Sequence, residues 1–305
     1  MSDNGSMLTT FMSRQSLAVC LAIGASLALV ACGGREPDAV PVATPTVTFK
    51  NPRVPLGSPV EVTYKFQVAA NAPKFDGDYR ILVHYLDADD ELMWADDHDP
   101  SIPTTQWKPG QTIEYTRTTF VPVYQYVGQA SVHIGLYSKT TQKRLALAGE
   151  HVGQLEYRAA TIQLLPTSEN VFVLFKDGWH PSETAPDNSG VEWQWTKKVA
   201  TLAFRNPRKP STFYLNGDNS STQAGPQTIQ IKVNGQPVDT VAVSPQKEFL
   251  HKTPLTIEQL GTGDMVEVTL DVDKTFVPAL NPSANNRDAR ELGVRIFHAF
   301  VEPQM

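Results

Sequence analysis

Five residues in the C-terminal half have the side chains of a sugar-binding surface: Trp179, His180, Glu183, Trp193 and Trp195. Trp193 and Trp195 are two positions apart, so in a strand both rings lie on one face. Flat apolar rings can stack on sugars, and a flanking carboxylate can bond their hydroxyls. Large aromatic residues in an alternating strand are also typical of a sandwich core. The sequence therefore leaves two interpretations open, a ligand platform and a buried strand.

The segment 87–99 concentrates acidic side chains around Trp94 and His98. Oxygen-rich loops can hold Ca²⁺, and the possible ligands here are Asp87, Asp89, Asp96, Asp97 and Asp99. Their spacing does not match an EF-hand loop. Asp89 and Asp90 fall where a hairpin turn is expected between predicted strands at 79–87 and 91–95, so a solvated turn is the competing interpretation.

Motifs of enzymes are missing from the sequence. It has no Gly-x-Ser-x-Gly elbow, no His-Glu-x-x-His and no phosphate loop. We therefore predict a protein that is not an enzyme and that uses no metal or cofactor. A glycosidase needs only two carboxylates about 5 to 10 Å apart. Sequence spacing does not display such a pair, so a hydrolase remains the third hypothesis.

The elements that position these residues are predicted to be strands. Val60, Val62, Tyr64, Phe66 and Val68 alternate with polar residues, which is typical of a half-buried antiparallel strand. The pattern recurs at 132–136, 229–233 and 266–272. Asn234-Gly235 predicts a hairpin turn, because both residues tolerate positive φ. Helical periodicity is limited to one possible turn at 256–260.

Short strands, 23 prolines and frequent turn signals predict an all-β protein of two tandem antiparallel β-sandwiches, Ig-like or jelly-roll-like. We place the first sandwich at 45–158 and the second at 159–305, with a new strand at 161–165. Phe49-Lys-Asn-Pro-Arg53 recurs as Phe204-Arg-Asn-Pro-Arg208, and Thr119-Phe-Val-Pro122 recurs as Thr275-Phe-Val-Pro278. These matches raise the question of whether the two halves arose by duplication.

Composition narrows the possible partners. Hydrophobic residues make up 41% of the chain, enough for substantial cores, and the formal net charge is −6. A mildly acidic chain without a basic run is not built to bind nucleic acid through its charges. The chain has two cysteines, Cys20 and Cys32. Cys20 lies in an apolar run at 17–30 that is too short to span a bilayer and has the length of a signal-peptide core.

The residues after that run are Leu29-Val-Ala-Cys32-Gly33. They resemble the lipobox of bacterial lipoproteins. The resemblance implies cleavage before Cys32, a covalent lipid on its thiol and anchoring in a membrane. Each buried methylene of an acyl chain contributes about 0.8 kcal/mol of membrane-binding free energy, so two or three chains hold a protein firmly on a bilayer.

Three expectations follow for the N-terminus. Residues 1–31 form a cleaved signal peptide, with translation starting at Met12, since residues 1–11 lack the basic start of an export signal. Residues 32–44 form a lipidated, extended tether that contains Pro37 and Pro41. Gly33 is not the Asp that retains many lipoproteins in the inner membrane, so we expect anchoring in the outer membrane, facing the periplasm or the cell surface.

A second resemblance lies in the first half, in Asp78-Tyr-Arg-Ile-Leu-Val-His-Tyr-Leu-Asp87, Trp107, Pro109-Gly110, Gly135-Leu-Tyr137 and Arg144-Leu145. These residues resemble the extracytoplasmic β-sandwich appended to bacterial membrane glycosyltransferases. The resemblance covers about residues 60–150 and implies a fold, since the catalytic domain is not there. Gly178-Trp-His180, Trp193-Gln-Trp195 and Arg290-Glu-Leu-Gly-Val-Arg295 are similar to jelly-roll domains of envelope proteins and, loosely, to carbohydrate-binding modules.

The sequence thus predicts a lipid-anchored protein of the bacterial envelope that acts as a non-enzymatic binding or assembly module, with an envelope protein or a glycan as its partner. The main alternative is a carbohydrate-binding lipoprotein that handles polysaccharide or surface glycan. The hydrolase hypothesis comes third.

Overall fold

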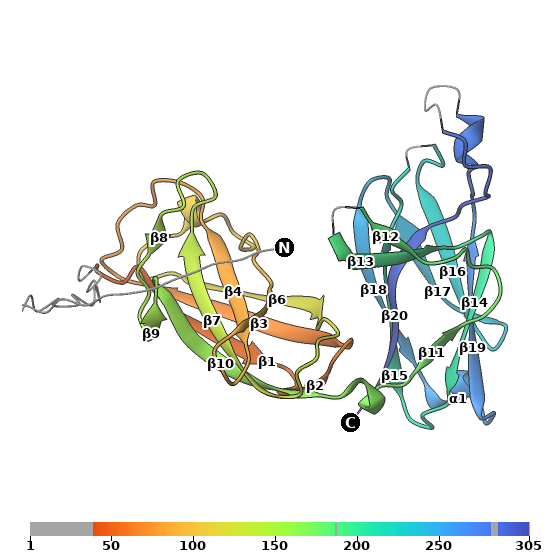
Figure 1. The fold of residues 1–305 in the computed structure, drawn as a ribbon, viewed down its shortest axis with the longest axis horizontal. Helices are drawn as coiled ribbons and strands as arrows, with labels where there is room; N and C mark the ends of the chain where they lie inside the picture. Colours follow the sequence, from red (N-terminus) through yellow and green to blue (C-terminus); the bar gives the residue numbers. More distant parts are fainter. Residues whose placement is uncertain (1–38, 187, 222, 282–285, 305) are drawn as a thin grey trace, which may run out of the picture. The chain divides into compact units, whose positions relative to one another are not determined.

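The computed structural model describes residues 39–186, 188–221, 223–281 and 286–304, without the side chains of 188–190. Residues 39–304 fall within one compact unit. The fold is almost entirely antiparallel β-sheet, as the alternating pattern predicts (Figure 1). No helix in the described ranges is long and apolar enough to cross a membrane. Cys32, Met12 and the predicted signal peptide lie outside the described residues.

The first sandwich has two sheets. One has the order β1-β3-β6 and the other β2-β10-β7-β4-β5, with β8 beside β7 and β9 beside β10. Pairing is antiparallel except between β2 and β10. The strands are β1 (Ala43–Phe49), β2 (Arg53–Pro55), β3 (Pro59–Val68), β4 (Arg80–Leu86), β5 (Leu92–Ala95), β6 (Thr112–Phe120), β7 (Gly128–Tyr137), β8 (Arg144–Leu145), β9 (Glu150–Gly153) and β10 (Glu156–Leu165), with a short helix η1 (Thr104–Gln106).

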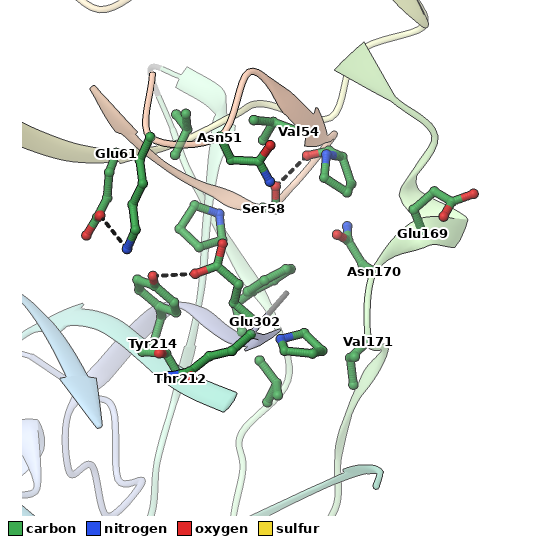
Figure 2. Close-up of a pocket in the computed structure, with 18 of the residues that line it drawn as sticks. Asn51, Val54, Ser58, Glu61, Glu169, Asn170, Val171, Thr212, Tyr214 and Glu302 are labelled. Atoms are coloured by element: carbon green, nitrogen blue, oxygen red, sulfur yellow. Dashed lines mark hydrogen bonds and ion pairs between the residues drawn. The ribbon is translucent and has the colours of Figure 1, made fainter. Parts of the chain in front are cut away.

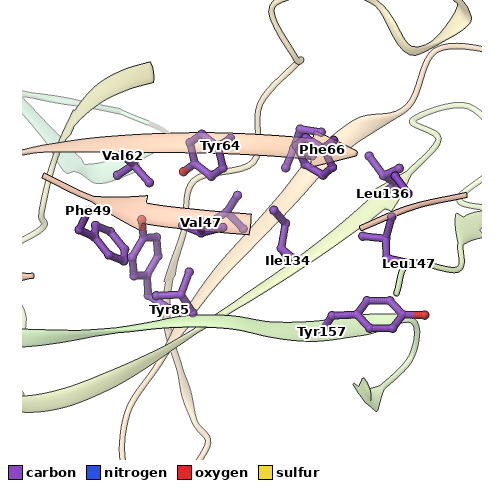
Figure 3. Close-up of a cluster of buried hydrophobic side chains, with 14 of the residues drawn as sticks. Val47, Phe49, Val62, Tyr64, Phe66, Tyr85, Ile134, Leu136, Leu147 and Tyr157 are labelled. Carbon is purple, nitrogen blue, oxygen red and sulfur yellow. The ribbon is translucent and has the colours of Figure 1, made fainter. Parts of the chain in front are cut away.

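The core of this sandwich comes from the alternation seen in the sequence. Val62, Tyr64 and Phe66 of β3 are completely buried. Their side chains face those of β4, β7 and β10, including Tyr85 and Ile134 (Figure 3). One face of every contributing strand is apolar, so burial of that face fixes the register of the sheets.

The second sandwich also has two sheets, with the orders β11-β14-β19-β16-β17 and β12-β13-β20-β15-β18. Its elements are β11 (Val173–Phe175), β12 (Glu183–Ala185), β13 (Asn188–Trp195), β14 (Val199–Arg205), β15 (Ser211–Asp218), β16 (Gln227–Val233), β17 (Gln236–Val243), β18 (Glu248–Leu255), α1 (Ile257–Leu260), β19 (Met265–Val272), η3 (Pro278–Leu280) and β20 (Arg295–Pro303). The helix η2 (Thr167–Glu169) precedes β11.

Local signals in this half are confirmed in detail. Asn234 and Gly235 both have positive φ, 50° and 81°, and they close the β16-β17 hairpin. Thr256 caps the single turn α1, since its hydroxyl accepts from the Gln259 amide and the Gln259 side chain bonds back. Val266, Val268, Leu270 and Val272 of β19 are fully buried, as alternation predicts.

Two predicted boundaries need correction. The division at 158/159, with a new strand from Thr161, is wrong because β10 runs unbroken from Glu156 to Leu165. It pairs with β7 on both sides of that point, and a bulge between Arg158 and Ala160 keeps the ladder going. The tether is also shorter than 32–44, because β1 begins at Ala43, which is 1% exposed.

The repeated pentapeptide corresponds to a repeated side-chain hydrogen bond, although the backbone differs, since Arg208 has φ 59° and Arg53 is not among the residues with positive φ. The Asn51 side chain accepts from the Arg53 amide at 3.1 Å, and that of Asn206 accepts from the Arg208 amide at 2.9 Å. Both follow a strand that ends in the same sequence context, so each is an Asx turn that ends a strand. The sheet orders of the two halves differ. The pentapeptide match is thus accounted for by local turn chemistry.

Candidate functional site

Backbone pairing brings the five residues of the predicted sugar platform near one another, but their side chains contact other residues of the chain. Glu183 pairs with Trp193 across β12 and β13. The His180 amide donates to the Trp195 carbonyl at 2.9 Å, and the His180 ring bonds the Glu291 carbonyl. The platform residues therefore form one neighbourhood at the edge of the second sandwich.

The tryptophan rings in that neighbourhood are covered. Trp195 is 7% exposed and meets Phe276 edge to face, with ring centroids 5.7 Å apart. The Arg295 guanidinium lies 4.8 Å from the Trp193 ring centre and 5.8 Å from that of Trp195. Arg295 is itself held by a two-point contact with Asp218, at 2.8 and 2.5 Å. The position over Trp193 that a sugar would use is thus taken by an arginine of the same chain.

The other platform residues are also engaged. Trp179 is half-buried and its indole N–H donates to the Thr201 carbonyl at 2.8 Å. Glu183 forms an ion pair with Arg290 at 2.7 Å, and Arg290 forms a second ion pair with Asp288. The pKa of Asp288 is held below its usual value, chiefly by its hydrogen bonds from Arg290. This arrangement stabilises the segment that covers Trp195 and leaves few groups for a ligand.

The acidic segment 87–99 forms the β4-β5 hairpin and its continuation. Asp87 accepts from the amides of Asp89 and Glu91, which closes the turn. Three of the remaining acids have partners: Asp96 pairs with Arg117, Asp97 accepts from the Val83 amide, and Asp99 pairs with Arg80 and Lys139. The Asp89 side chain is exposed in the turn. Among the described residues, no three His, Cys, Asp or Glu side chains are arranged to hold a metal ion.

Asp96 belongs to a buried polar cluster with His98, Tyr64, Tyr115 and Arg117. The Asp96 carbonyl can only accept, so His98 donates from Nδ1 and its Nε2 accepts from the Tyr115 hydroxyl at 2.8 Å. Burial lowers the pKa of His98 to about 4, so the ring is neutral. Burial also raises the pKa of Asp96. Asp96, His98 and Tyr115 bond within this cluster, which lies between β6 and the segment after β5 and has a structural role, whereas the buried Nε of Arg117 has no hydrogen-bond partner among the described residues.

A pocket of about 410 Å³ is the strongest candidate for a binding site (Figure 2). This volume is within the usual range for small-molecule sites, about 300 to 1,000 Å³. It is lined from β2, β3, the segment around η2, β15 and β20. Its lining residues are Lys50, Asn51, Arg53, Val54, Pro55, Ser58, Pro59, Val60, Glu61, Glu169, Asn170, Val171, Thr212, Tyr214, Phe300, Val301, Glu302, Pro303 and Gln304.

Tyr214 and Glu302 form the fixed polar pair of the pocket. Thr212 pairs with Glu302 and Tyr214 with Phe300 across β15 and β20, so these side chains share one face of the sheet. The Tyr214 hydroxyl donates to Oε2 of Glu302 at 2.7 Å. Burial raises the pKa of Tyr214, and the bond to Glu302 raises it further. Tyr214 therefore remains a donor, and Oε1 of Glu302 has no hydrogen-bond partner among the described residues.

Glu61 is the second carboxylate of the pocket and it is held by two lysines. Lys252 bonds one oxygen, and Lys50 bonds the other at 2.8 Å. Hydrogen bonds from Lys252 and then from Lys50 hold the pKa of Glu61 below its usual value, so it is ionised near neutral pH. Figure 2 shows Glu61 to one side of the pocket, with Glu302 and Tyr214 below it.

Asn170 provides an acceptor that the chain leaves unused. Its Nδ2 donates to the Leu56 carbonyl at 2.8 Å, which fixes the amide orientation. Its Oδ1 is buried and has no partner within the described residues. A buried acceptor without a donor costs about 1 to 3 kcal/mol, which a bound donor or an ordered water can recover. Asn170 and Glu302 therefore present two free acceptors to the same cavity.

The sequence patterns did not point to this pocket. Tyr214, Glu302 and Asn170 are far apart in the chain and belong to no motif. The only available signal was the pentapeptide Phe49–Arg53, because Lys50, Asn51 and Arg53 line the pocket. That signal was ambiguous, since Asn206 in the second copy of the pentapeptide makes the same side-chain hydrogen bond and the second copy lines no part of the pocket.

Comparison with known proteins gave structural neighbours only. No family model and no curated protein matches the sequence. One neighbour is the CBM36-1 domain of a multidomain xylanase from the hindgut metagenome of Trinervitermes trinervoides, at 10% identity and TM-score 0.28, over 45% of this chain and 99% of that one. Another is a family 35 carbohydrate-binding module from Clostridium thermocellum, at 10% identity and TM-score 0.27, over 44% and 99%.

A third neighbour matches over a longer stretch. It is SGBP-B from a complex xyloglucan utilization locus in Bacteroides uniformis, at 10% identity and TM-score 0.33, over 87% of this chain and 74% of that one. Identities and TM-scores this low say nothing about the ligand of this chain. The function has to be argued from its own side chains.

Proposed function

We propose that this protein is a lipid-anchored envelope protein that binds a neutral carbohydrate in the pocket of Tyr214 and Glu302 and does not transform it. The observation that carries this proposal is the pair of unused acceptors, Oδ1 of Asn170 and Oε1 of Glu302, in one cavity. Sugar hydroxyls are donors and acceptors at once. They can donate to these two oxygens.

The rest of the lining supports the same ligand class. Donors for ligand oxygens come from Arg53, which forms no ion pair with any described residue, and from the Asn51 amide group. Phe300 and the prolines at 55, 59 and 303 give apolar surface for the C–H faces of a sugar. Cations and carboxylates both line the pocket, which suits a neutral polar ligand better than an ion.

Lipid anchoring at Cys32 is part of the proposal. Val42 and Ala43 lie at one end of β1, whereas Lys50 and Asn51 of the pocket follow its other end. The ten residues from Cys32 to Val42 can span at most about 35 Å. The chain from Cys32 joins the first sandwich at the end of β1 opposite Lys50 and Asn51. Cys32→Ser should release a folded protein from the membrane fraction.

The pocket can be tested with the chain from residue 33 onward, which contains every described strand and both hydrophobic cores. A panel of neutral gluco-, xylo- and galacto-oligosaccharides is titrated calorimetrically. We expect Glu302→Gln to weaken binding about tenfold, because it replaces a charged acceptor by a neutral one. Glu267→Gln, an exposed carboxylate outside the pocket, is the matched control and should bind normally.

Two outcomes would contradict the proposal. Binding that is lost in Trp193→Phe and kept in Glu302→Gln would assign the sugar to the tryptophan neighbourhood. Shorter oligosaccharides in the recovered ligand would make the protein a hydrolase with Glu61 and Glu302 as the carboxylates to examine.

A further inference from the structure

The strands at the edges of the sheets differ in how they are protected against pairing with another chain. Edge strands leave a row of backbone donors and acceptors open, and proteins commonly protect them by shortness, proline or lysine. Six of the bordering strands among the described residues are four residues or shorter: β2, β5, β8, β9, β11 and β12. Three longer ones contain a proline, namely Pro45 in β1, Pro237 in β17 and Pro254 in β18.

β6 is the exception. It has nine residues, Thr112–Phe120, and contains neither proline nor lysine. All nine pair with β3 on one side, from Thr112 with Gln67 to Phe120 with Pro59. Within the described residues, no backbone hydrogen bond joins its other side to the chain. Arg117 points inward, where its guanidinium lies 3.2 Å from the carboxylate of Asp96. Its charge therefore does not prevent another strand from pairing with the edge.

We propose that β6 is an interface, and that its occupant is β6 of a second copy of this chain, paired antiparallel about a twofold axis at Thr116. Thr116 is the midpoint of the strand, so this register pairs all nine residues. Glu114 then faces Thr118 of the second copy, and Tyr115 faces Arg117 of the second copy. No like charges are opposed, and an arginine beside an aromatic ring is favourable.

Other registers are less suitable. A twofold axis at Glu114 opposes two carboxylates, and an axis at Arg117 opposes two guanidinium groups, both of which destabilise a strand pair. An axis at Tyr115 opposes no like charges but pairs only residues 112–118. The sequence of β6 thus favours one self-complementary register, which is what a symmetric interface requires.

A row of threonines on the outer face continues across the proposed seam. Thr48, Thr63 and Thr116 are register partners on β1, β3 and β6. The hydroxyls of Thr63 and Thr116 lie 2.8 Å apart. In the dimer, Thr116 meets Thr116 of the second copy directly, so the same hydroxyl contact repeats at the axis. Cross-strand threonine pairs of this type stabilise a strand pair.

The interface is tested with the chain from residue 33 onward, which has no cysteine. Light scattering coupled to size exclusion should report a dimer. Thr116→Lys places two ammonium groups opposite each other at the axis, so we expect its dimer dissociation constant to rise at least about tenfold. Thr48→Lys is the matched control, because it lies on the same face and in the same row but far from the seam, and it should remain dimeric.

Oxidative cross-linking fixes the register. Thr116→Cys should form a disulfide-linked dimer, since residues opposed at the axis have a Cα separation that a disulfide spans. Thr112→Cys should not, because its partner in this register is residue 120 of the second copy. A monomeric unsubstituted chain would overturn the interface. A dimer that survives Thr116→Lys without cross-linking through Thr116→Cys would place the seam elsewhere.

Discussion

The tryptophan neighbourhood and the pocket contain similar types of residue but differ in whether their carboxylate and amide oxygens are paired. Both combine an aromatic ring, a carboxylate and a basic side chain. Around Trp193 and Trp195, Arg295 reaches over the rings and Asp218 holds it there. In the pocket, the Tyr214 ring is buried, while oxygens of Glu302 and Asn170 stay unpaired. Residue type did not distinguish the two regions. Around the tryptophans, Glu183 and Asp218 are paired with arginines, and the unpartnered buried atom among the described residues is a donor, Nε1 of Trp193. The pocket instead leaves acceptors unpaired.

The largest expected effect is in the tryptophan neighbourhood. Trp195→Ala should lower the free energy of unfolding by about 3 to 5 kcal/mol, because it leaves a cavity beside Phe276. Urea denaturation measures this loss. Phe172→Ala is the control, since this ring is 77% exposed and its loss should be nearly neutral. A stable Trp195→Ala variant that loses sugar binding would reverse the roles of the two regions.

The next effect tests the arginine that covers the rings. Arg295→Lys keeps the charge but loses the planar contact with Trp193 and the two-point contact with Asp218. We expect the free energy of unfolding to fall by about 2 kcal/mol. Acrylamide should then quench tryptophan fluorescence more strongly, since one ring face opens to solvent. Unchanged quenching would mean that Arg295 does not shield Trp193.

A smaller effect is expected in the pocket. Tyr214→Phe removes the hydroxyl that donates to Glu302, and should cost about 1 kcal/mol of stability. It also frees the second oxygen of Glu302, so sugar affinity should change while the fold is kept. Thermal unfolding and calorimetric titration report the two quantities separately. A variant that changes neither would show that the Tyr214–Glu302 bond does not organise the pocket.

The smallest effect is a change in pH dependence. Hydrogen bonds from Lys252 and Lys50 lower the pKa of Glu61 below its ordinary 4.5. Its contribution to stability is therefore complete above pH 4.5 and is lost as the pH falls through the lowered folded-state pKa. Glu61→Gln should flatten the acid limb of the stability curve. Glu267→Gln is the control and should retain the steeper decline.

Local features were predictable because they depend on neighbours in the chain. The Asn234-Gly235 turn, the capped turn at Thr256 and the buried alternation of β3 and β19 need only backbone preferences and period two. The end of the first sandwich was misplaced for the same reason. A bulge after Arg158 interrupts the alternation that the prediction relied on, although the strand continues.

The sequence by itself determined the strand pattern, the all-β class and the mildly acidic charge, and its resemblance to a lipobox is the basis for the proposed anchor. Tertiary structure decided which polar groups are left without partners. Asn170, Tyr214 and Glu302 come from separate segments of the chain. Pairing of β15 with β20 brings Tyr214 and Glu302 together, and the course of the chain after β10 brings Asn170 to the same cavity. It also decided that β6 lies at an edge. Strand order depends on contacts between distant residues, which local propensity does not encode.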